Sequence, residues 1–444
     1  MNYREQTLWS LRRGRSDPLA FLTSLAERGD FVPFSIAGQR AFLLNRPDYV
    51  EEVLISHASK FAKGFANQRA KHLLGNGLLT ADGPLHSDRR RLIQPAFGRQ
   101  RLKEYGPVMV AHAVRLRDEW RDGDVVDVPR AMGRLTFGIV GETVIGAVVG
   151  PLYEEVRQAV QQATASMDAL VTLLAPLRRV RPEQVRLHRV VDRLLAAPST
   201  DAGSLLSLLR TGTDTKDQIR DDVLTILLAG HDTITNALTW TWLLLAENPE
   251  VDARLRQEIA AVLGHNPPTA ADVPRLPYAR SVLAEALRLY PPAWVLARRS
   301  VEPHQLDAGT IPAGALVLVS QYLMHRNARY FDRPLAFEPE RWLSEGQAAR
   351  PKMAYFPFGA GARSCIGEAF GWMEGVLVLV SILQRWRLQP VDACRPDIEA
   401  RITLRPRHDV LMRVSTSSTG ITGLTKEPSH ASQVAVVGEN ASAG

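Results

Sequence analysis

One cysteine lies inside a glycine-rich stretch of ten residues that begins at Phe358 and ends at Gly367. The glycines of this stretch permit a tight turn and let a large flat ligand approach the backbone. Arg363 carries a rigid fork of N–H donors that suits a carboxylate. The thiolate of Cys365 is a ligand that heme iron accepts, and it pushes electron density toward O–O bond cleavage. These residue types in this order predict a heme held by a thiolate.

The simpler interpretation of a lone cysteine is a buried structural residue in a turn. Residues 368–386 argue against it, because a helix beginning there would aim backbone N–H groups at the sulfur and favour its anionic form. The stretch resembles the cysteine-ligand loop of the cytochrome P-450 superfamily, the heme-thiolate monooxygenases. The family pattern is Phe-x-x-Gly-x-Arg-x-Cys-x-Gly, and its fixed positions are filled by Phe358, Gly361, Arg363, Cys365 and Gly367. The resemblance implies heme b as the cofactor, with Cys365 as the axial ligand of its iron.

A second set of chemically useful residues lies inside the longest helical pattern, 215–248, which opens with a capping box. Residues 229–233 read Ala-Gly-His-Asp-Thr, and a glycine, an acid and a hydroxyl are poor choices in mid-helix. Function is expected where local preference is violated. The segment resembles the family's long central helix over the heme, which implies that Thr233 hydrogen-bonds dioxygen and that Asp232 relays protons. The alternatives are a surface carboxylate and a hydroxyl bonded back to the preceding turn.

Other basic residues are candidates for holding the heme propionates. His86 and Arg90 are four residues apart, so they share a face of a predicted helix and could clasp a propionate. The alternative is a solvated basic helix face. By the resemblance, Arg298 or Arg299 meets a propionate from a strand predicted over 293–299, and we favour Arg298.

A charge network is expected beside the cysteine loop. Glu285 and Arg288 are three residues apart on a predicted helix and can pair, although any helix can contain such a pair by chance. Arg341 follows about fifty residues later in a Phe-Glu-Pro-Glu-Arg-Trp segment. Together they resemble the family's Glu-x-x-Arg helix and its partner arginine loop. The resemblance implies that Glu285, Arg288 and Arg341 form a buried, largely structural network.

The elements that must position these residues form one large domain. Most of the chain has helical patterns, and a hairpin is predicted from strands at 31–36 and 41–44. The fold class is therefore mainly α with a smaller β region, an α+β arrangement that matches the P-450 fold. We place the domain at 17–414, after a polar segment at 1–16. Residues 415–444 are rich in Ser, Thr, Gly and Ala without an aromatic residue, which predicts a disordered tail.

Composition narrows the class of protein. Two cysteines, Cys365 and Cys394, exclude a disulfide framework, and we assign Cys394 no role. No apolar run reaches the ~18–20 residues of a membrane helix. The first 16 residues lack the apolar core of a signal peptide, so we expect a cytoplasmic monomer without a membrane. The net charge is +7, which could favour nucleic acid, but we find no nucleic-acid module. The default explanation of the charge is a solvated basic surface, and the more specific one is an acidic redox partner.

The resemblance implies a monooxygenase that inserts one atom of O₂ into an organic substrate. Electrons would come from NAD(P)H through a separate ferredoxin or flavodoxin with its reductase. The basic residues expected to steer that partner are Arg89, Arg91, Arg99 and Lys352. Two alternatives stay open: a peroxide-driven or oxygen-independent heme-thiolate enzyme, and a non-enzymatic heme or gas sensor.

The resemblance also places five stretches around the substrate pocket, at 65–79, 167–174, 226–233, 293–296 and 402–404. Four of them are dominated by apolar residues, while the first carries Arg69, Lys71 and His72. An apolar lining favours a hydrophobic ligand. We therefore expect a hydrophobic small molecule, a terpenoid or polyketide-like intermediate, rather than a sugar or an amino acid.

Overall fold

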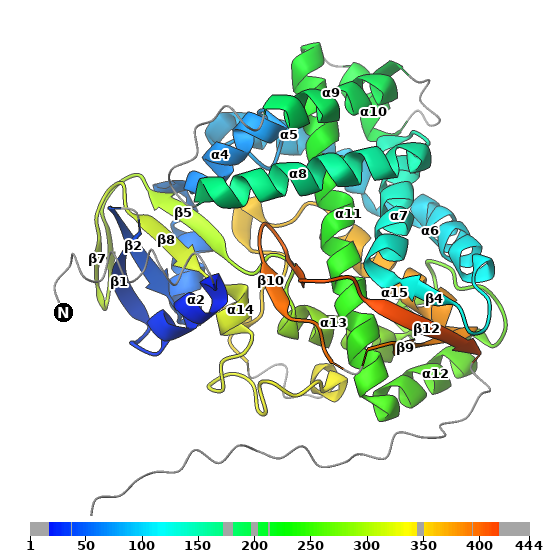
Figure 1. Ribbon diagram of the computed structural model, residues 1–444. Coiled ribbons are helices and arrows are strands. Elements are labelled where there is room, and N and C mark those ends of the chain that lie inside the picture. The colour runs from blue at the N-terminus through cyan, green and yellow to red at the C-terminus, as the bar shows by residue number, and fades with distance from the viewer. Residues whose placement is uncertain are drawn as a thin grey trace, which may run out of the picture.

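A computed structural model describes residues 17–36, 38–171, 181–196, 203–211, 214–343, 350–392 and 394–416 (Figure 1). The segment 1–16 and nearly all of the predicted tail lie outside these residues. The last strand continues to Thr416, two residues beyond the predicted domain boundary at Val414.

Helices make up most of the described chain. Their bounds are α2 Pro18–Ala26, α3 Pro47–Glu51, α4 Phe65–Leu74, α5 Gly83–Ile93, α6 Arg99–Glu119, α7 Val128–Val140, α8 Tyr153–Val171, α9 Arg181–Ala196, α10 Leu205–Arg210, α11 Lys216–Glu247, α12 Pro249–Leu263, α13 Pro277–Leu289, α14 Gln321–Met324 and α15 Glu368–Leu383. The strands are β1 Phe31–Ile36, β2 Gln39–Leu44, β3 Phe61–Lys63, β4 Val125–Asp127, β5 Leu296–Ser300, β6 His304–Leu306, β7 Gly309–Ile311, β8 Leu316–Val319, β9 Trp386–Pro390, β10 Ile398–Ala400, β11 Leu404–Pro406 and β12 Leu411–Thr416.

The strands form small sheets beside a larger helical region (Figure 1). The main sheet has the order β1-β2-β8-β5-β3, in which β2 and β8 run parallel and the other pairs are antiparallel. The other sheets are β4-β12-β9, β10-β11 and β6-β7. The mainly α fold with a smaller β region, predicted from the sequence, is confirmed.

Local sequence signals explain the first elements. The side chain of Asp17 caps α2 by accepting hydrogen bonds from the backbone N–H groups of Leu19 and Ala20, and Pro18 occupies the first helical position. The predicted hairpin is present, with Phe31 paired to Leu44. Gly38 turns the chain with a φ of 78°, a conformation that favours glycine.

Helix α11 runs through the centre of the molecule (Figure 1). The hydroxyl of Thr215 accepts a hydrogen bond from the N–H of Gln218 at 3.2 Å, so the predicted cap is in place. Trp240 is fully buried and stacks on Tyr290 at 4.0 Å between ring centroids. A Cβ at Gly230 would lie 2.7 Å from a methyl of Val140 on α7, so this glycine lets the two helices pack closely. Helix packing is therefore a structural reason for a glycine in mid-helix, and the sequence did not reveal it.

Glu374 is a buried acid in the core of α15. Its side chain is fully buried, and neither carboxyl oxygen has a hydrogen-bond partner within the described part of the chain. Burial raises the pKa of Glu374 well above its ordinary value, so the folded protein keeps the proton.

We expect the substitution Glu374→Gln to flatten the dependence of stability on pH. As pH rises past the unfolded-state pKa of ~4.3, the unfolded chain releases this proton while the folded protein retains it. The wild type therefore loses stability with rising pH until the folded-state pKa is reached, and the glutamine variant escapes this loss. Urea unfolding should be measured between pH 5 and 7. The free energy of unfolding of the variant, minus that of the wild type, should increase with pH. A difference that stays constant over this range would contradict a protonated Glu374.

Candidate active site

The cysteine loop is a tight turn that two glycines make possible. The backbone N–H of Cys365 donates to the carbonyl oxygen of Phe358 at 2.8 Å, which closes the loop just before α15. Gly359 and Gly361 have φ values of 69° and 71°. A Cβ at Gly361 would lie 2.1 Å from the backbone oxygen of Leu54, so no other residue fits there.

The thiol of Cys365 lies on an internal surface. The residue is exposed, yet the protein surrounds it closely enough that burial raises the pKa of the thiol. The backbone N–H of Gly367 acts in the opposite direction by hydrogen-bonding the sulfur. Because desolvation outweighs this hydrogen bond, a bound cation is needed to hold the residue as a thiolate, which metal coordination does.

Open space also borders the middle of α11. Ala229 is exposed although it lies halfway along this helix, whose neighbouring turns are buried. The hydroxyl of Thr233 donates to the carbonyl oxygen of Ala229 at 3.0 Å, which is the back-bonded arrangement named above as the alternative. Asp232 is half-buried, and its carboxylate accepts a hydrogen bond from the hydroxyl of Thr403 at 2.7 Å. Thr403 anchors the acid from a distant loop, a partner that the sequence did not identify.

Three buried basic side chains gather at the edge of the main sheet and the start of α5. Lys63 on β3 pairs directly with Arg298 on β5, and His86 on α5 is buried with them. Burial, aided by the charge of Arg363, lowers the pKa of Lys63 to about 7, of His86 to about 4 and of Arg298 to about 10. Like charges opposite each other destabilise a sheet, so this cluster favours a bound anion.

The cluster contains a buried N–H donor without an acceptor, and a carboxylate could accept its hydrogen bond. Nε of Arg298 is buried and has no hydrogen-bond partner among the described residues. The ammonium of Lys63 donates to the carbonyl oxygens of Leu78 and Leu79 at 2.9 and 2.7 Å. Arg299, the alternative to Arg298, is exposed.

Two other predicted propionate ligands already have protein partners. Arg90 donates to the carbonyl oxygen of Ser364 at 2.7 Å, and so supports the backbone beside the cysteine. Arg363 pairs with the carboxylate of Asp82 at 2.7 Å and donates to the carbonyl oxygen of Phe61 at 2.9 Å. Both arginines therefore brace the loop, and their remaining N–H groups are what a carboxylate could use.

The structure brings the three members of the expected charge network together. Glu285 pairs with Arg288 at 2.8 Å and with Arg341 at 2.9 Å, and all three side chains are buried. The indole N–H of Trp342 donates to the same carboxylate at 2.8 Å. Arg288 also donates to the carbonyl oxygen of Ala336 at 2.9 Å. This network ties α13 to the segment that follows α14.

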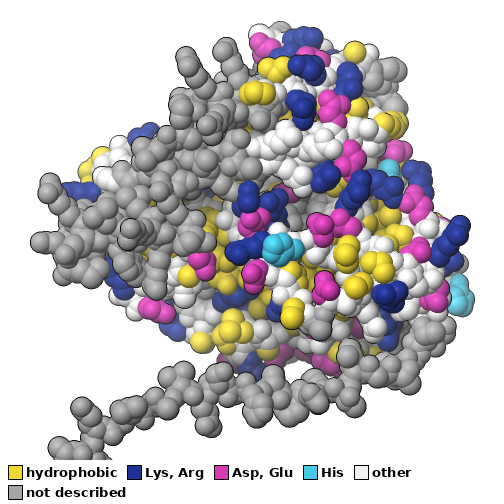
Figure 2. Space-filling model, viewed as in Figure 1, with side chains coloured by type: hydrophobic (Ala, Val, Ile, Leu, Met, Phe, Trp, Pro, Cys, Tyr) yellow, Lys and Arg dark blue, Asp and Glu magenta, His cyan; other side chains and the backbone are white. Residues whose placement is uncertain are grey.

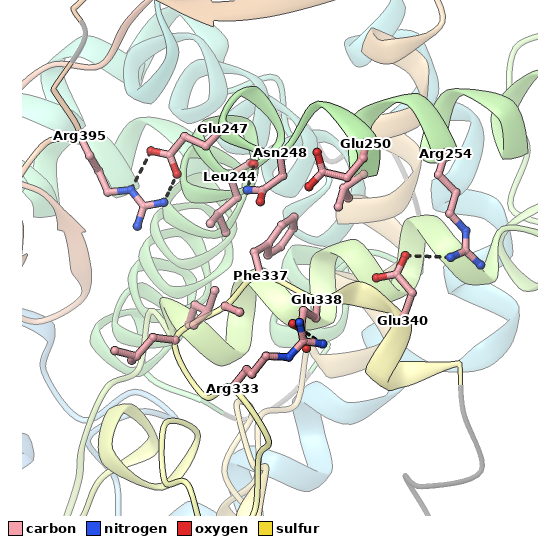
Figure 3. A pocket seen from close by; sticks show the side chains of 14 residues that line it. Leu244, Glu247, Asn248, Glu250, Arg254, Arg333, Phe337, Glu338, Glu340 and Arg395 are labelled. Carbon is pink, nitrogen blue, oxygen red and sulfur yellow. Dashed lines mark hydrogen bonds and ion pairs between the residues drawn. The ribbon is translucent and has the colours of Figure 1, made fainter. Parts of the chain in front are cut away.

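A surface cleft of about 710 Å³ lies at the carboxyl end of α11 (Figure 3). Most of its charged side chains are paired with one another, as Arg254 is with Glu340 at 2.8 Å and Arg395 with Glu247. None of the site residues predicted from the sequence lines it. The cleft is therefore not the candidate active site.

Comparison with known proteins decides the family. A family model described as Cytochrome P450 matches residues 7–194 and 200–412. The chain belongs to the cytochrome P450 family. It is accordingly a P450 monooxygenase with a heme-iron cofactor. The unsatisfied Arg298, the buried cations around it and the open thiol of Cys365 are groups that suit an anionic, iron-containing cofactor.

Relatives of this P450 cover nearly the whole domain. Cyclooctatin synthase from Streptomyces melanosporofaciens is 37% identical over 412 residues, 88% of this chain and 90% of the relative. Pentalenene oxygenase from Streptomyces avermitilis is 32% identical over 414 residues, covering 88% and 90%. The crystal structure of CYP175A1 from Thermus thermophilus has a TM-score of 0.76 at 28% identity, covering 91% of this chain and 96% of that one.

Two further observations concern the surface of this P450. Arg89 was expected to steer a redox partner, and that prediction is wrong: its side chain is 5% exposed and pairs with Asp214 and Asp222 at 2.7 and 2.5 Å. It holds α5 to the start of α11 instead. No helix among the described residues is both long and apolar enough to cross a membrane.

Proposed function

We propose that this P450 binds heme b and inserts one oxygen atom from O₂ into a hydrophobic small molecule. Cys365 would hold the iron, and His86, Arg298 and Lys63 would hold the propionates, with Arg90 and Arg363 bracing the loop. Phe358 and Gly367 belong to the same loop. The observation that carries the proposal is a complete thiolate loop beside a buried group of cations with an unsatisfied arginine.

The heme would supply the redox chemistry of dioxygen, and the protein would supply protons and access. Asp232 is half-buried and held by Thr403, so it could pass protons from solvent toward the interior. The hydroxyl of Thr233 could leave its bond to Ala229 and donate a proton into the open space beside that turn. The exposed surface of Ala229 supports this role, because it leaves space on that turn of α11.

We expect the substitution Thr233→Ala to uncouple the reaction. The variant should bind heme and substrate, consume reductant and O₂ at a comparable rate, and release mostly peroxide, because the hydroxyl that directs proton delivery is missing. Thr239→Ala is the matched control, since Thr239 makes the same back-bond on α11, to Thr235 at 2.8 Å, at a buried position. The ratio of product to O₂ consumed should fall in the first variant alone; equal ratios would remove Thr233 from the mechanism.

Apolar residues in the stretches that were predicted to line the substrate pocket support a hydrophobic substrate. Trp294 and Leu296 are half-buried beside Arg298 on the β5 segment, and Ile402 is 57% exposed next to Thr403. Two relatives are named cyclooctat-9-en-7-ol 5-monooxygenase and pentalenene oxygenase, and these names denote an unsaturated alcohol and an alkene. Burial of apolar surface would provide most of the affinity. The substrate class we propose is a terpenoid or polyketide-like intermediate.

A panel of ligands read by the heme Soret band tests this proposal. A substrate that displaces the water on the iron shifts the iron toward high spin, so binding is visible without turnover. Apolar polycyclic compounds should give the shift at micromolar concentration, while sugars and amino acids of similar size should not. If only small, highly polar compounds gave it, the substrate proposal would fail, and Arg69 and Lys71 of α4 would be the first residues to change.

Electrons would come from NAD(P)H through a separate ferredoxin or flavodoxin and its reductase. Of the basic residues expected to meet that partner, Arg91, Arg99 and Lys352 are exposed. Figure 2 shows acidic and basic side chains interspersed on the face that it draws, so the excess positive charge is not gathered there. An acidic partner would then recognise these few exposed basic residues rather than a broad positive surface. Its affinity should fall as the salt concentration rises.

A further inference from the structure

A second group of metal-ligating side chains lies outside the heme site. Glu52, His57 and His304 each offer one ligand atom, and these three atoms all lie within 4.8 Å of one another. None of the three takes part in the proposed chemistry at the heme. Together they provide two imidazoles and one carboxylate, the ligand set of many three-ligand zinc sites.

The local backbone explains why Glu52 and His57 are neighbours. After α3 the helix widens into a π-helical turn over Glu52–Ser56, and the N–H of His57 donates to the carbonyl oxygen of Glu52 at 2.9 Å. In an α-helix, residues five apart point in different directions, whereas a π-turn brings them almost into line. Nδ1 of His57 consequently lies 2.5 Å from a carboxylate oxygen of Glu52. Such π-turns are frequent at functional sites.

His304 approaches the same carboxylate from the sheet. It begins β6, its side chain is 4% exposed, and its ring meets the edge of Phe61 at 5.3 Å. Nε2 of His304 is buried without a hydrogen-bond partner in the described part of the chain, and it lies 3.4 Å from the Glu52 carboxylate. An unsatisfied buried imidazole nitrogen costs free energy unless a ligand completes it.

We propose that Glu52, His57 and His304 bind a divalent transition-metal ion, with Zn²⁺ as the ion that fits the ligand set and a water as the fourth ligand. The edge of a zinc tetrahedron with bonds of ~2.1 Å is about 3.4 Å, which matches the separation of His304 from Glu52. The distance from Nδ1 of His57 to the Glu52 carboxylate, now 2.5 Å, would have to increase by about 1 Å to reach the same edge length. Two imidazoles select such a metal over Ca²⁺ or Mg²⁺, which prefer oxygen ligands.

The access of the ligands to solvent supports metal binding. His57 and Glu52 are 41% and 37% exposed, so an ion can reach them from solvent. The buried histidine would form the base of the site and the two exposed residues its rim.

The site is joined to the cysteine loop through the backbone. Gly361 packs against the carbonyl oxygen of Leu54 within the π-turn, and Arg363 donates to the carbonyl oxygens of Ala58 and Phe61. A metal that ties this turn to β6 would therefore stiffen the segment behind the heme ligand. Metal binding should raise the unfolding temperature of the holoenzyme, because a ligand that binds only the folded state stabilises it.

Equilibrium dialysis of the untagged holoenzyme against Zn²⁺, with the metal counted by mass spectrometry, tests the proposal. We expect the wild type to bind one Zn²⁺ per heme above non-specific binding. The variants His57→Asn, Glu52→Gln and His304→Asn should each fail to bind this ion. The exposed His265 provides the control, and His265→Asn should keep the ion. Because His57 and Glu52 are partly exposed, their variants should fold even if the His304 variant does not.

The outcome is decided by stoichiometry and thermal stability together. Zn²⁺ should raise the unfolding temperature of the wild type and of His265→Asn, and leave that of His57→Asn unchanged. Binding of Ca²⁺ with equal stoichiometry would overturn the assignment to a transition metal. Uptake of Zn²⁺ that is the same in all variants, or no uptake at all, would overturn the site.

Discussion

We expect Cys365→Ala to abolish the red-shifted Soret band of the ferrous–CO complex. That band reports a thiolate bound to the iron, and Cys365 is the cysteine whose loop the glycines and Arg363 hold in place. Burial raises the pKa of the Cys365 thiol, so the thiolate of the proposed ligand would depend on a bound iron. The loss should be complete, since residues 358–367 contain no second cysteine to replace the sulfur.

The control is Cys394→Ala, which removes the other cysteine of the chain. Cys394 is exposed and lies after β9, far along the chain from the ligand loop. This variant should keep the band unchanged. If Cys394→Ala lost the band while Cys365→Ala kept it, the assignment of the ligand would be reversed.

The second large effect is expected at the buried charge network. Glu285→Gln leaves Arg288 buried without its counter-charge and leaves Arg341 with Glu338 alone, and losing one partner of a buried ion pair costs about 3–5 kcal/mol. Tyr355, which precedes the cysteine loop, donates to the carbonyl oxygen of Ala284 on α13 at 3.0 Å, so we expect a loosened α13 to lower heme retention as well. Urea unfolding of the purified protein and the ratio of heme to protein measure the two effects.

An exposed ion pair provides the matched control for the network. Glu119 pairs with Arg134 at 2.5 Å, but the two side chains are 46% and 55% exposed. Such surface pairs contribute about 0–1 kcal/mol, so Glu119→Gln should unfold almost like the wild type. Equal losses in Glu285→Gln and Glu119→Gln would show that burial of the network does not set its contribution.

Much of the site could be predicted because its signals are local in the sequence. The cap at Asp17, the capping hydroxyl of Thr215 and the hairpin at Gly38 each depend on residues within a few positions. The ligand loop is equally local, since ten consecutive residues determine its turn. These elements appear in the structure close to their predicted bounds.

The features that were not predicted depend on distant partners. A β region was expected over residues 301–321, but the pairing of β8 with β2, with Ala41 opposite Leu316, joins segments that are far apart in the sequence. Helix α4, Phe65–Leu74, lacks apolar periodicity in the sequence and was not predicted. The helix predicted to Trp386 ends at Leu383, because Trp386 begins β9 and pairs with β12.

The site residues that the sequence did not single out also depend on partners that are distant in the sequence. Lys63 gains its significance from the cross-strand position of Arg298, which no spacing in the sequence reveals. Thr403 becomes relevant only because the fold places it against Asp232. The π-turn at Glu52 was predicted as ordinary helix, and the pairing of Glu52 with His57 depends on that change of helical period.

The most direct test of the central claim is turnover under ¹⁸O₂ with an apolar polycyclic alkene that gives the high-spin shift, using ferredoxin, its reductase and NAD(P)H. The account predicts a product that carries one ¹⁸O atom, with the other in water, and no product when O₂ is absent. A product without ¹⁸O would contradict it and indicate an oxygen-independent isomerase. Product formed with added peroxide but not with O₂ and reductant would likewise contradict the proposed oxygen and electron source.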